Sequence, residues 1–280
     1  PHPAIRPSST SRGLGDVSKR QLVLGCRKFI IGLGGSATND GGIGMLQALG
    51  YGFFDAGGNA VPFGAKGLEK LSSISMEGSL PLLREAEFHV ACDVKNPLCG
   101  PNGSSAVFGP QKGADKTMVR QMDGWMESYA GLAKERIAGA DRFYPGAGAA
   151  GGLGFAFHTF LNAALEPGIE IVMRETGLEE KVKKADIVVT GEGCLDGQTT
   201  MGKAPMGVAG LAQKYKKPVI AFAGCTGEGV EKCNEKGIDA YFSILQKVVS
   251  VKEAMDTRTA ERNVENTAEQ VFRLVHRLWH

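Results

Sequence analysis

The apolar positions of this chain fall into two kinds of segment, short continuous runs and longer stretches with helical spacing. The short runs predict buried strands at residues 29–31, 87–92, 186–190, 218–222 and 240–244. Apolar residues three or four positions apart predict helices at residues 13–24, 43–49, 118–133, 155–164, 169–184, 205–215 and 230–236. A capping box at Ser250 and Glu253 opens a last helix, and residues 51–58 predict a hairpin.

Strands and helices alternate regularly in the C-terminal half, which predicts a parallel sheet covered on both faces. The fold class is therefore α/β, and 280 residues suffice for two domains. We place the boundary at the glycine-rich loop 144–154, so that residues 20–148 form a middle α/β domain and residues 149–280 a second α/β domain. Residues 1–19 are expected to be a leader or the remnant of an N-terminal region. The loop 144–154 itself is either a hinge or an anion site.

The first strand runs into a glycine-rich loop that precedes a helix. Six glycines fall within residues 32–44, together with short polar side chains. Such a loop exposes backbone N–H groups beside a helix N-terminus, which suits a phosphate or carboxylate; the alternative is a tight turn. The candidate binding residues are Gly34, Gly35, Ser36, Thr38, Asn39 and Asp40, and we expect Asn39 and Asp40 to face a cleft.

Composition and spacing exclude several classes of function. The net charge of +2 is spread along the chain, which predicts neither a nucleic-acid nor a membrane partner. The first glycine loop lacks the Lys-Ser/Thr ending of a Walker A loop, and the missing acidic fingerprint disfavours a dinucleotide-binding oxidoreductase. The six cysteines show no zinc-ligand spacing and fit a reducing compartment, so we expect a cytoplasmic protein.

Two further polar loops follow predicted strands, at the carboxyl ends where α/β sheets bind ligands. Residues 93–103 carry Asp93 and Asn96, and Asp93 either meets a ligand or caps a turn. Lys112 lies on another turn-rich loop, residues 106–113. The loop after residue 190 holds Gly191, Glu192, Gly193, Asp196, Gln198, Thr199 and Lys203.

Carboxylates, amides and a lysine on glycine-rich loops are suited to phosphoryl transfer. Carboxylates hold Mg²⁺ or accept a hydroxyl proton, and lysine stabilises phosphoryl oxygens. We expect Asp196 to act as base or Mg²⁺ ligand with Glu192 as its partner, and Lys203 to contact the phosphates. Asp93 would approach from the other domain. The alternative is that Asp196 and Gln198 only hold their loop together.

Five motifs carry a resemblance to a known family. They are Gly-Gly-Ser-Ala-Thr-Asn-Asp-Gly-Gly (34–42), Ala-Cys-Asp-Val-x-Asn-Pro-Leu-Cys-Gly-Pro-x-Gly (91–103), Phe-Gly-Pro-Gln-Lys-Gly (108–113), Pro-Gly-Ala-Gly-Ala-Ala-Gly-Gly-Leu-Gly (145–154) and Thr-Gly-Glu-Gly-x-x-Asp-x-Gln-Thr (190–199). In this order they resemble the bacterial glycerate kinase family, type 1. The resemblance implies ATP-dependent phosphorylation of D-glycerate, usually to 2-phosphoglycerate, with Mg²⁺. It also implies two α/β domains. Residues 149–280 belong to a Rossmann-like domain that is built from both ends of the chain, and the middle domain is inserted into it.

The sequence departs from the family at its start. The family's early Asp-Ser-Phe-Lys and Asp-Gly-Gly-Glu-Gly-Thr segments are not found here. We therefore expect the Rossmann-like domain to be incomplete at its N-terminus and to expose an apolar sheet edge, which is compatible with a homo-oligomer. The alternative function is a non-catalytic nucleotide- or sugar-acid-binding remnant of the same scaffold.

Overall fold

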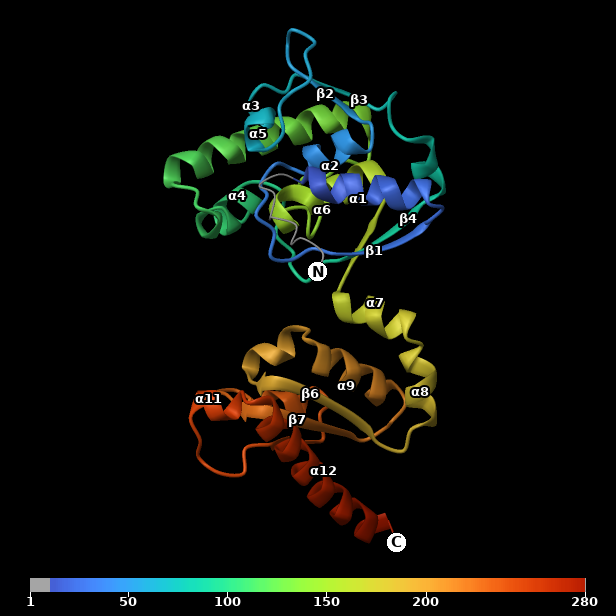
Figure 1. The fold of residues 1–280 in the computed structure, drawn as a ribbon, viewed down its shortest axis with the longest axis vertical. Coiled ribbons are helices and arrows are strands. Elements are labelled where there is room, and N and C mark those ends of the chain that lie inside the picture. Colours follow the sequence, from blue (N-terminus) through green and yellow to red (C-terminus); the bar gives the residue numbers. More distant parts are fainter. Residues whose placement is uncertain (1–10, 280) are drawn as a thin grey trace. The chain divides into compact units, whose positions relative to one another are not determined.

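The computed structural model describes residues 11–279, so residues 1–10 of the expected leader (1–19) lie outside the described part. The chain divides into two compact units, and the boundary along the chain lies between Gly168 and Ile169 (Figure 1). The sequence placed this division at residues 148 and 149. It falls later because the helix that follows residue 148 contributes to the core of the first unit.

The first unit combines a parallel sheet with helices and a small antiparallel pair of strands. Its elements are α1 (Arg12–Val23), β1 (Lys28–Gly32), α2 (Ile43–Ala48), β2 (Gly52–Phe54), α3 (Ala65–Glu69), β3 (Ser73–Ser75), η1 (Pro81–Glu85), β4 (Glu87–Ala91), α4 (Ser104–Phe108), η2 (Pro110–Lys112), α5 (Lys116–Arg136), α6 (Ala149–Leu161) and β5 (Ala164–Glu166). The parallel sheet has the order β1-β4-β5, and β2 pairs with β3. The short β5 was not predicted.

One face of the β1-β4-β5 sheet carries the core of this unit. Phe29 of β1 lies opposite Phe88 of β4, and their rings stack with centroids 4.8 Å apart. Side chains alternate along β1, so that Ile30 on the other face is 54% exposed. Helix α6 is apolar almost all round and buries Phe155 and Phe157 completely. Burial of each such ring contributes about 1.5–3 kcal/mol.

The loop 144–154 packs against the first glycine loop. Ala150, Gly151 and Gly152 have φ angles of 50°, 74° and 92°, so the start of α6 is interrupted by left-handed backbone. The N–H group of Gly41 donates to the carbonyl of Gly151 over 2.9 Å. A Cβ atom at Gly151 would lie only 2.0 Å from the carbonyl oxygen of Thr38. These glycines serve close backbone contact inside the first unit and do not form a hinge between the units.

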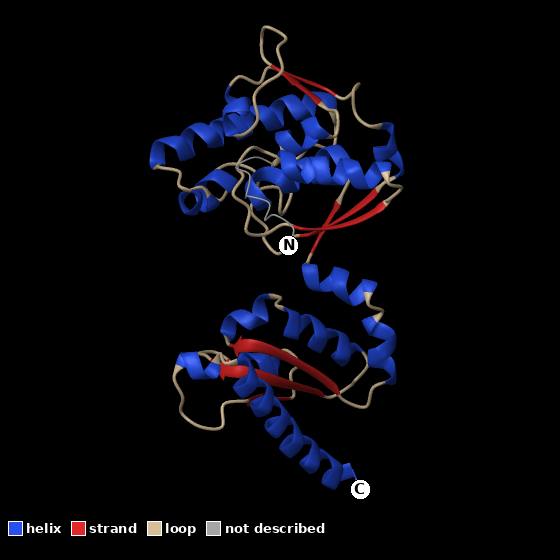
Figure 2. Cartoon of the chain, in the orientation of Figure 1, coloured by secondary structure: helices blue, strands red, loops and turns tan. Residues whose placement is uncertain are grey.

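The second unit is a three-stranded parallel sheet with helices between its strands (Figure 2). Its elements are α7 (Gly168–Glu175), α8 (Leu178–Lys184), β6 (Val188–Leu195), η3 (Gly197–Met201), α9 (Ala204–Lys214), β7 (Val219–Thr226), α10 (Lys232–Glu235), β8 (Ala240–Ser243), α11 (Val251–Ala254) and α12 (Thr257–Trp279). The strand order is β6-β7-β8, and α9 and α12 lie on opposite faces (Figure 1). This α/β architecture confirms the predicted fold class.

Two predicted elements of this unit differ from the structure. The helix expected at residues 169–184 is broken into α7 and α8, because Gly177 adopts a left-handed φ of 60°. Strand β6 continues five residues and strand β7 four residues beyond their predicted ends, to Leu195 and Thr226. Glycine has a low strand propensity, so the local sequence did not predict that the strands continue. Pairing between β6 and β7 extends both strands.

The close packing around α6 generates a test on stability. Gly154→Ala would place a Cβ atom 2.0 Å from the carbonyl oxygen of Gly146, so we expect the free energy of unfolding to fall by about 1–3 kcal/mol or more. The matched control is Gly131→Ala in α5, where nothing lies within 4 Å of the added atom. That substitution should stabilise the protein by about 0.5–1 kcal/mol. Chemical denaturation measures both, and equal effects would contradict the packing described.

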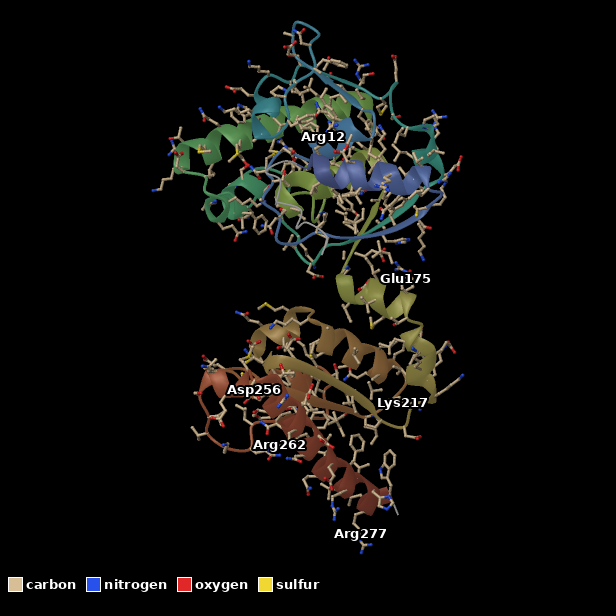
Figure 3. All side chains as sticks on the ribbon, viewed as in Figure 1. Arg12, Glu175, Lys217, Asp256, Arg262 and Arg277 are labelled. Atoms are coloured by element: carbon tan, nitrogen blue, oxygen red, sulfur yellow. The ribbon has the colours of Figure 1, made fainter. Side chains whose placement is uncertain are left out.

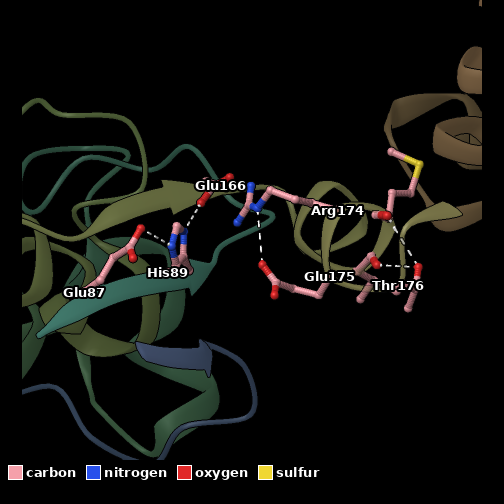
Figure 4. A network of polar contacts seen from close by, with 8 residues as sticks. Glu87, His89, Glu166, Arg174, Glu175 and Thr176 are labelled. Atoms are coloured by element: carbon pink, nitrogen blue, oxygen red, sulfur yellow. Dashed lines mark hydrogen bonds and ion pairs between the residues drawn. The ribbon is translucent and has the colours of Figure 1, made fainter. Parts of the chain in front are cut away.

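A histidine on β4 lies between two carboxylates (Figure 4). The Nδ1 atom of His89 is 2.7 Å from Oε1 of Glu166 on β5, and its Nε2 atom is 2.7 Å from Oε1 of Glu87. The hydrogen bond to Glu166 is the main cause of a raised pKa for His89, and Glu87 adds to it. The ring therefore links β4 to β5, and the two carboxylates favour its protonated form.

This network predicts a pH dependence of stability. Because the folded-state pKa of His89 is raised, its contribution is complete below the unfolded value of about 6.5 and is lost as pH rises through the folded value. We expect the free energy of unfolding to decrease over that window, and His89→Gln to flatten the decrease. Glu85→Gln, which removes a carboxylate paired with Arg27 instead, is the control. An unchanged slope in the His89 variant would refute the assignment.

Candidate functional site

Asp40 is a buried anchor of the first unit. Its side chain is fully buried, and its carboxylate accepts hydrogen bonds from Ser11 N (2.9 Å), Ser11 Oγ (3.0 Å), Thr38 Oγ1 (2.8 Å) and Gly42 N (3.0 Å). It therefore ties the residue before α1 to the loop that leads into α2. The expectation that Asp40 faces a cleft is wrong, because four donors hold the carboxylate in the interior.

Asn39 is buried in the same way. Its Oδ1 atom accepts a hydrogen bond from Ser104 Oγ over 2.9 Å, and its Nδ2 atom donates to Ser105 Oγ over 3.0 Å. Asn39 thus joins the glycine loop to α4, and the expectation that it faces a cleft is also wrong. The hydroxyl partners are about 65 residues away in the sequence, so no local pattern could have shown them. Thr38 is buried beside both residues.

The exposed part of the loop is its beginning. Gly34, Gly35 and Ser36 border a cavity of about 200 Å³ at the carboxyl ends of β1 and β4. The remaining walls are Leu33, Val94, Phe108, Gln111, Lys112 and Ala150. The structure therefore separates the predicted phosphate-binding residues into an exposed group, 34–36, and a buried group, 38–40.

Lys112 brings a positive charge to this cavity. Its Nζ atom donates to Ser36 Oγ over 3.1 Å and to the carbonyl of Thr38 over 2.6 Å. Burial lowers the pKa of Lys112, and the charge of Asp40 acts in the opposite direction. The sequence placed Lys112 on a turn-rich loop without giving it a role. Only the tertiary fold brings that loop to the first glycine loop.

Asp93 and Asn96 lie on the loop after β4. Asp93 is exposed, and its Oδ1 atom accepts the N–H group of Gly168 over 3.0 Å. Asn96 donates from Nδ2 to the carbonyl of Asn102 over 2.9 Å and so closes its own loop. Asp93 therefore accepts the N–H group of the last residue of the first unit and does not cap its own turn, and its role toward a ligand stays a prediction.

The second unit places Asp196 directly after β6. Gly191, Glu192 and Gly193 belong to the strand itself, with Glu192 opposite Ala223 of β7, so they are not loop residues as predicted. Asp196 caps η3: its Oδ1 atom accepts from Thr199 N over 2.9 Å and Thr199 Oγ1 over 3.1 Å. Thr199 is fully buried by this capping box.

Lys203 lies beside Asp196. Its Nζ atom is 3.8 Å from Oδ1 of Asp196, and both side chains are partly open to solvent. The hydrogen bond from the Thr199 backbone is the main cause of a lowered pKa for Asp196, and the charge of Lys203 adds to it. Asp196 is therefore ionised at neutral pH. Gln198 is exposed on the same turn.

This arrangement sets limits on the chemistry. Within residues 11–279, no three or more His, Cys, Asp and Glu side chains form a group that could hold a metal ion. A Mg²⁺ ion in phosphoryl-transfer enzymes needs only one or two carboxylates, because substrate phosphates and water supply the rest. Asp196 offers one such carboxylate. Glu192, the other predicted ligand, lies four residues earlier on β6, a span of about 13 Å along an extended strand. Lys203 beside Asp196 supplies a positive charge of the kind that stabilises phosphoryl oxygens.

Comparison with known proteins places these features in a family. Residues 2–276 match the Glycerate kinase family. The chain is 47% identical over 246 residues to the glycerate 2-kinase of Escherichia coli strain K12, covering 88% of this chain and 65% of that protein. It is 43% identical over 267 residues to the glycerate kinase of Haemophilus influenzae strain Rd, covering 95% and 70%.

A solved structure agrees with these relatives. It is the crystal structure of a Salmonella typhimurium LT2 protein described as glycerate kinase 2, with a TM-score of 0.84 and 41% identity. The match covers 99% of this chain and 72% of that one. The chain thus spans 65% of the length of the Escherichia coli relative and 70% of the Haemophilus influenzae relative. Sequence, motifs and fold agree over nearly the whole chain, which therefore belongs to the glycerate kinase family.

Proposed function

We propose that this chain carries out the family's phosphoryl transfer, from ATP to D-glycerate, with 2-phosphoglycerate as the favoured product. The observation that carries the proposal is the ionised Asp196 beside Lys203 at the carboxyl end of β6. Its most direct support from relatives is the 47% identity to a protein named glycerate 2-kinase.

In this proposal Asp196 binds Mg²⁺ rather than accepting a proton. A general base works best when its pKa lies near the operating pH, whereas the pKa of Asp196 is lowered. A permanently ionised carboxylate is instead suited to a cation. Glu192, four residues earlier on β6, is the second candidate ligand. When bound, Mg²⁺ would neutralise charge on the transferring phosphoryl group.

Lys203 and Asp93 complete the proposal from the residues predicted by sequence. Lys203 is 40% exposed at the start of α9, so its ammonium group can reach phosphoryl oxygens while staying near Asp196. Asp93 is the remaining exposed carboxylate among the candidates, and it is the next candidate for the hydroxyl proton of glycerate. Gln198, exposed on the turn after Asp196, is a candidate for contact with the nucleotide.

A second candidate function is binding of a nucleotide or sugar acid without turnover. The chain matches 65% of the Escherichia coli relative and 70% of the Haemophilus influenzae relative. If the unmatched residues of those relatives are needed for catalysis, binding without turnover is the favoured function. An assay that couples ADP release to D-glycerate separates the two functions. We expect glycerate-dependent ADP release, from this chain or from the chain joined to the N-terminal segment of a longer relative. Binding of ATP and D-glycerate with no ADP release in either form would favour the binding function.

A matched pair of aspartates tests the role of Asp196. Asp256, labelled in Figure 3, caps the start of α12 with the same bonds, accepting from Thr259 N over 2.9 Å and Thr259 Oγ1 over 2.8 Å. In the form that turns over glycerate, Asp196→Asn should lower kcat by about two to four orders of magnitude, because the charge that holds the cation is lost. Asp256→Asn should leave kcat unchanged.

Both substitutions keep an oxygen that can accept the capping bonds, so both variants should melt within about 2 °C of the parent protein. Steady-state kinetics and calorimetry measure the two effects. A loss of kcat smaller than tenfold in Asp196→Asn, or an equal loss in Asp256→Asn, would remove Asp196 from the chemistry and make Asp93 the next candidate.

The proposed setting of the reaction is the cytoplasm. All six cysteines are free thiols, which is usual in a reducing compartment. No helix within residues 11–279 is long and apolar enough to cross a membrane. Assembly into a homo-oligomer remains a prediction from the exposed apolar side chains, such as Val189 on β6, which is 47% exposed.

A further inference from the structure

The cavity beside Lys112 has the size of a small ligand. Its volume is about 200 Å³. A cavity of about 150 Å³ holds a benzene molecule, whereas pockets for drug-sized ligands start at about 300 Å³. Glycerate, with three carbons and four oxygens, fits this space, whereas a complete nucleotide would have to extend beyond it.

The cavity also holds a cation that makes no direct ion pair with the described residues. Lys112 has no carboxylate within ion-pair distance among residues 11–279, although its side chain is partly buried. Two of its three N–H donors contact Ser36 Oγ and the carbonyl of Thr38, which leaves the third for a ligand. A partly buried ammonium group gains most from an anion that enters the cavity, because its own hydration is reduced.

Backbone donors lie next to this lysine. Within the described chain, the N–H groups of Gly34, Gly35 and Ser36 donate no hydrogen bond, whereas Leu33 N, just before them, donates to the carbonyl of Ala91. Successive backbone N–H groups bind an anion where a turn brings them together, and Gly35, in the middle of the three, has a left-handed φ of 59°. Opposite them, Ala150 keeps a left-handed φ of 50°, a strained state typical of residues at ligand sites.

We propose that this cavity binds the carboxylate of the glycerate substrate, with Lys112 and the amides of residues 34–36 as its donors. This rests on the proposed function for the identity of the acid. The apolar side chains of Leu33, Val94 and Phe108 form the other walls and fit the carbon skeleton. A phosphate group of ATP is the other anion that these donors could hold, with the rest of the nucleotide extending out of the cavity, and the experiment below distinguishes the two.

Two glycines, two positions apart, provide the test. A Cβ atom added at Gly34 or at Gly32 meets nothing within 4 Å, and neither glycine has a positive φ. Gly34 borders the Lys112 cavity, whereas Gly32 belongs to β1 and borders a different hollow beside α1. Gly34→Asp and Gly32→Asp therefore introduce the same charge with little cost to the fold, and only the first places it against the anion.

The experiment measures binding by titration calorimetry on the full chain, with D-glycerate, with glycerol, which lacks the carboxylate, and with ATP. We expect Gly34→Asp to weaken D-glycerate binding at least tenfold and Gly32→Asp to change it less than twofold. ATP affinity should stay the same in both variants, and glycerol should not bind. Lys112→Gln should weaken D-glycerate binding as well, and Lys112→Arg should restore part of it because the charge returns.

Three outcomes would overturn the inference. They are undetectable binding of D-glycerate to the parent chain, equal binding by both glycine variants, and a loss of ATP affinity in Gly34→Asp with D-glycerate binding preserved. The last outcome would assign the cavity to a phosphate group. The proposed kinase function is judged separately by ADP release. If Gly34→Asp still turns over glycerate at low concentration, only the assignment of the cavity to the glycerate carboxylate is refuted. If the chain binds glycerate without turnover, only the kinase function is refuted.

Discussion

The contact between two glycine-rich loops is the constraint on which the first unit depends. Gly41 and Gly151 are 110 positions apart, yet a hydrogen bond of 2.9 Å joins their backbones. Any side chain at Gly151 would collide with the backbone of Thr38, so the approach is possible only for glycine. The same contact holds Ala150 in its left-handed conformation at the rim of the Lys112 cavity. Packing in the interior therefore sets the geometry of the surface site.

The polar groups of the first glycine loop differ in burial along the chain. Asn39 and Asp40 satisfy hydroxyl and backbone donors in the interior, where an unpaired polar group would cost about 1–3 kcal/mol. Residues 34–36 keep free donors toward solvent. The buried residues fix the loop, and Lys112 is held against its start by hydrogen bonds to Ser36 and Thr38. In the proposed site, a loop that is fixed in advance lowers the entropic cost of binding.

Asp40 and Asp196 are carboxylates in similar loops that differ in their accessibility to solvent. Asp40 is fully buried and receives four hydrogen bonds, so nothing from solvent reaches it. Asp196 uses one oxygen, Oδ1, for its capping bonds and remains partly open beside Lys203. Its lowered pKa keeps it charged, and its exposure allows a cation to approach. Accessibility, more than residue type, separates the structural carboxylate from the candidate functional one.

The sequence by itself determined the α/β class, most strands and helices, and the family, because hydrophobic period and glycine-rich motifs are local properties. It also singled out Asp196 and residues 34–36 as candidates, a prediction that remains to be tested. Only the tertiary structure decided that β6 runs on to Leu195, since that extension depends on pairing with β7. It alone buried Asn39 and Asp40 and brought Lys112 to Ser36, 76 positions away. Burial and long-range hydrogen bonds depend on partners distant in the chain, and no local pattern contains them.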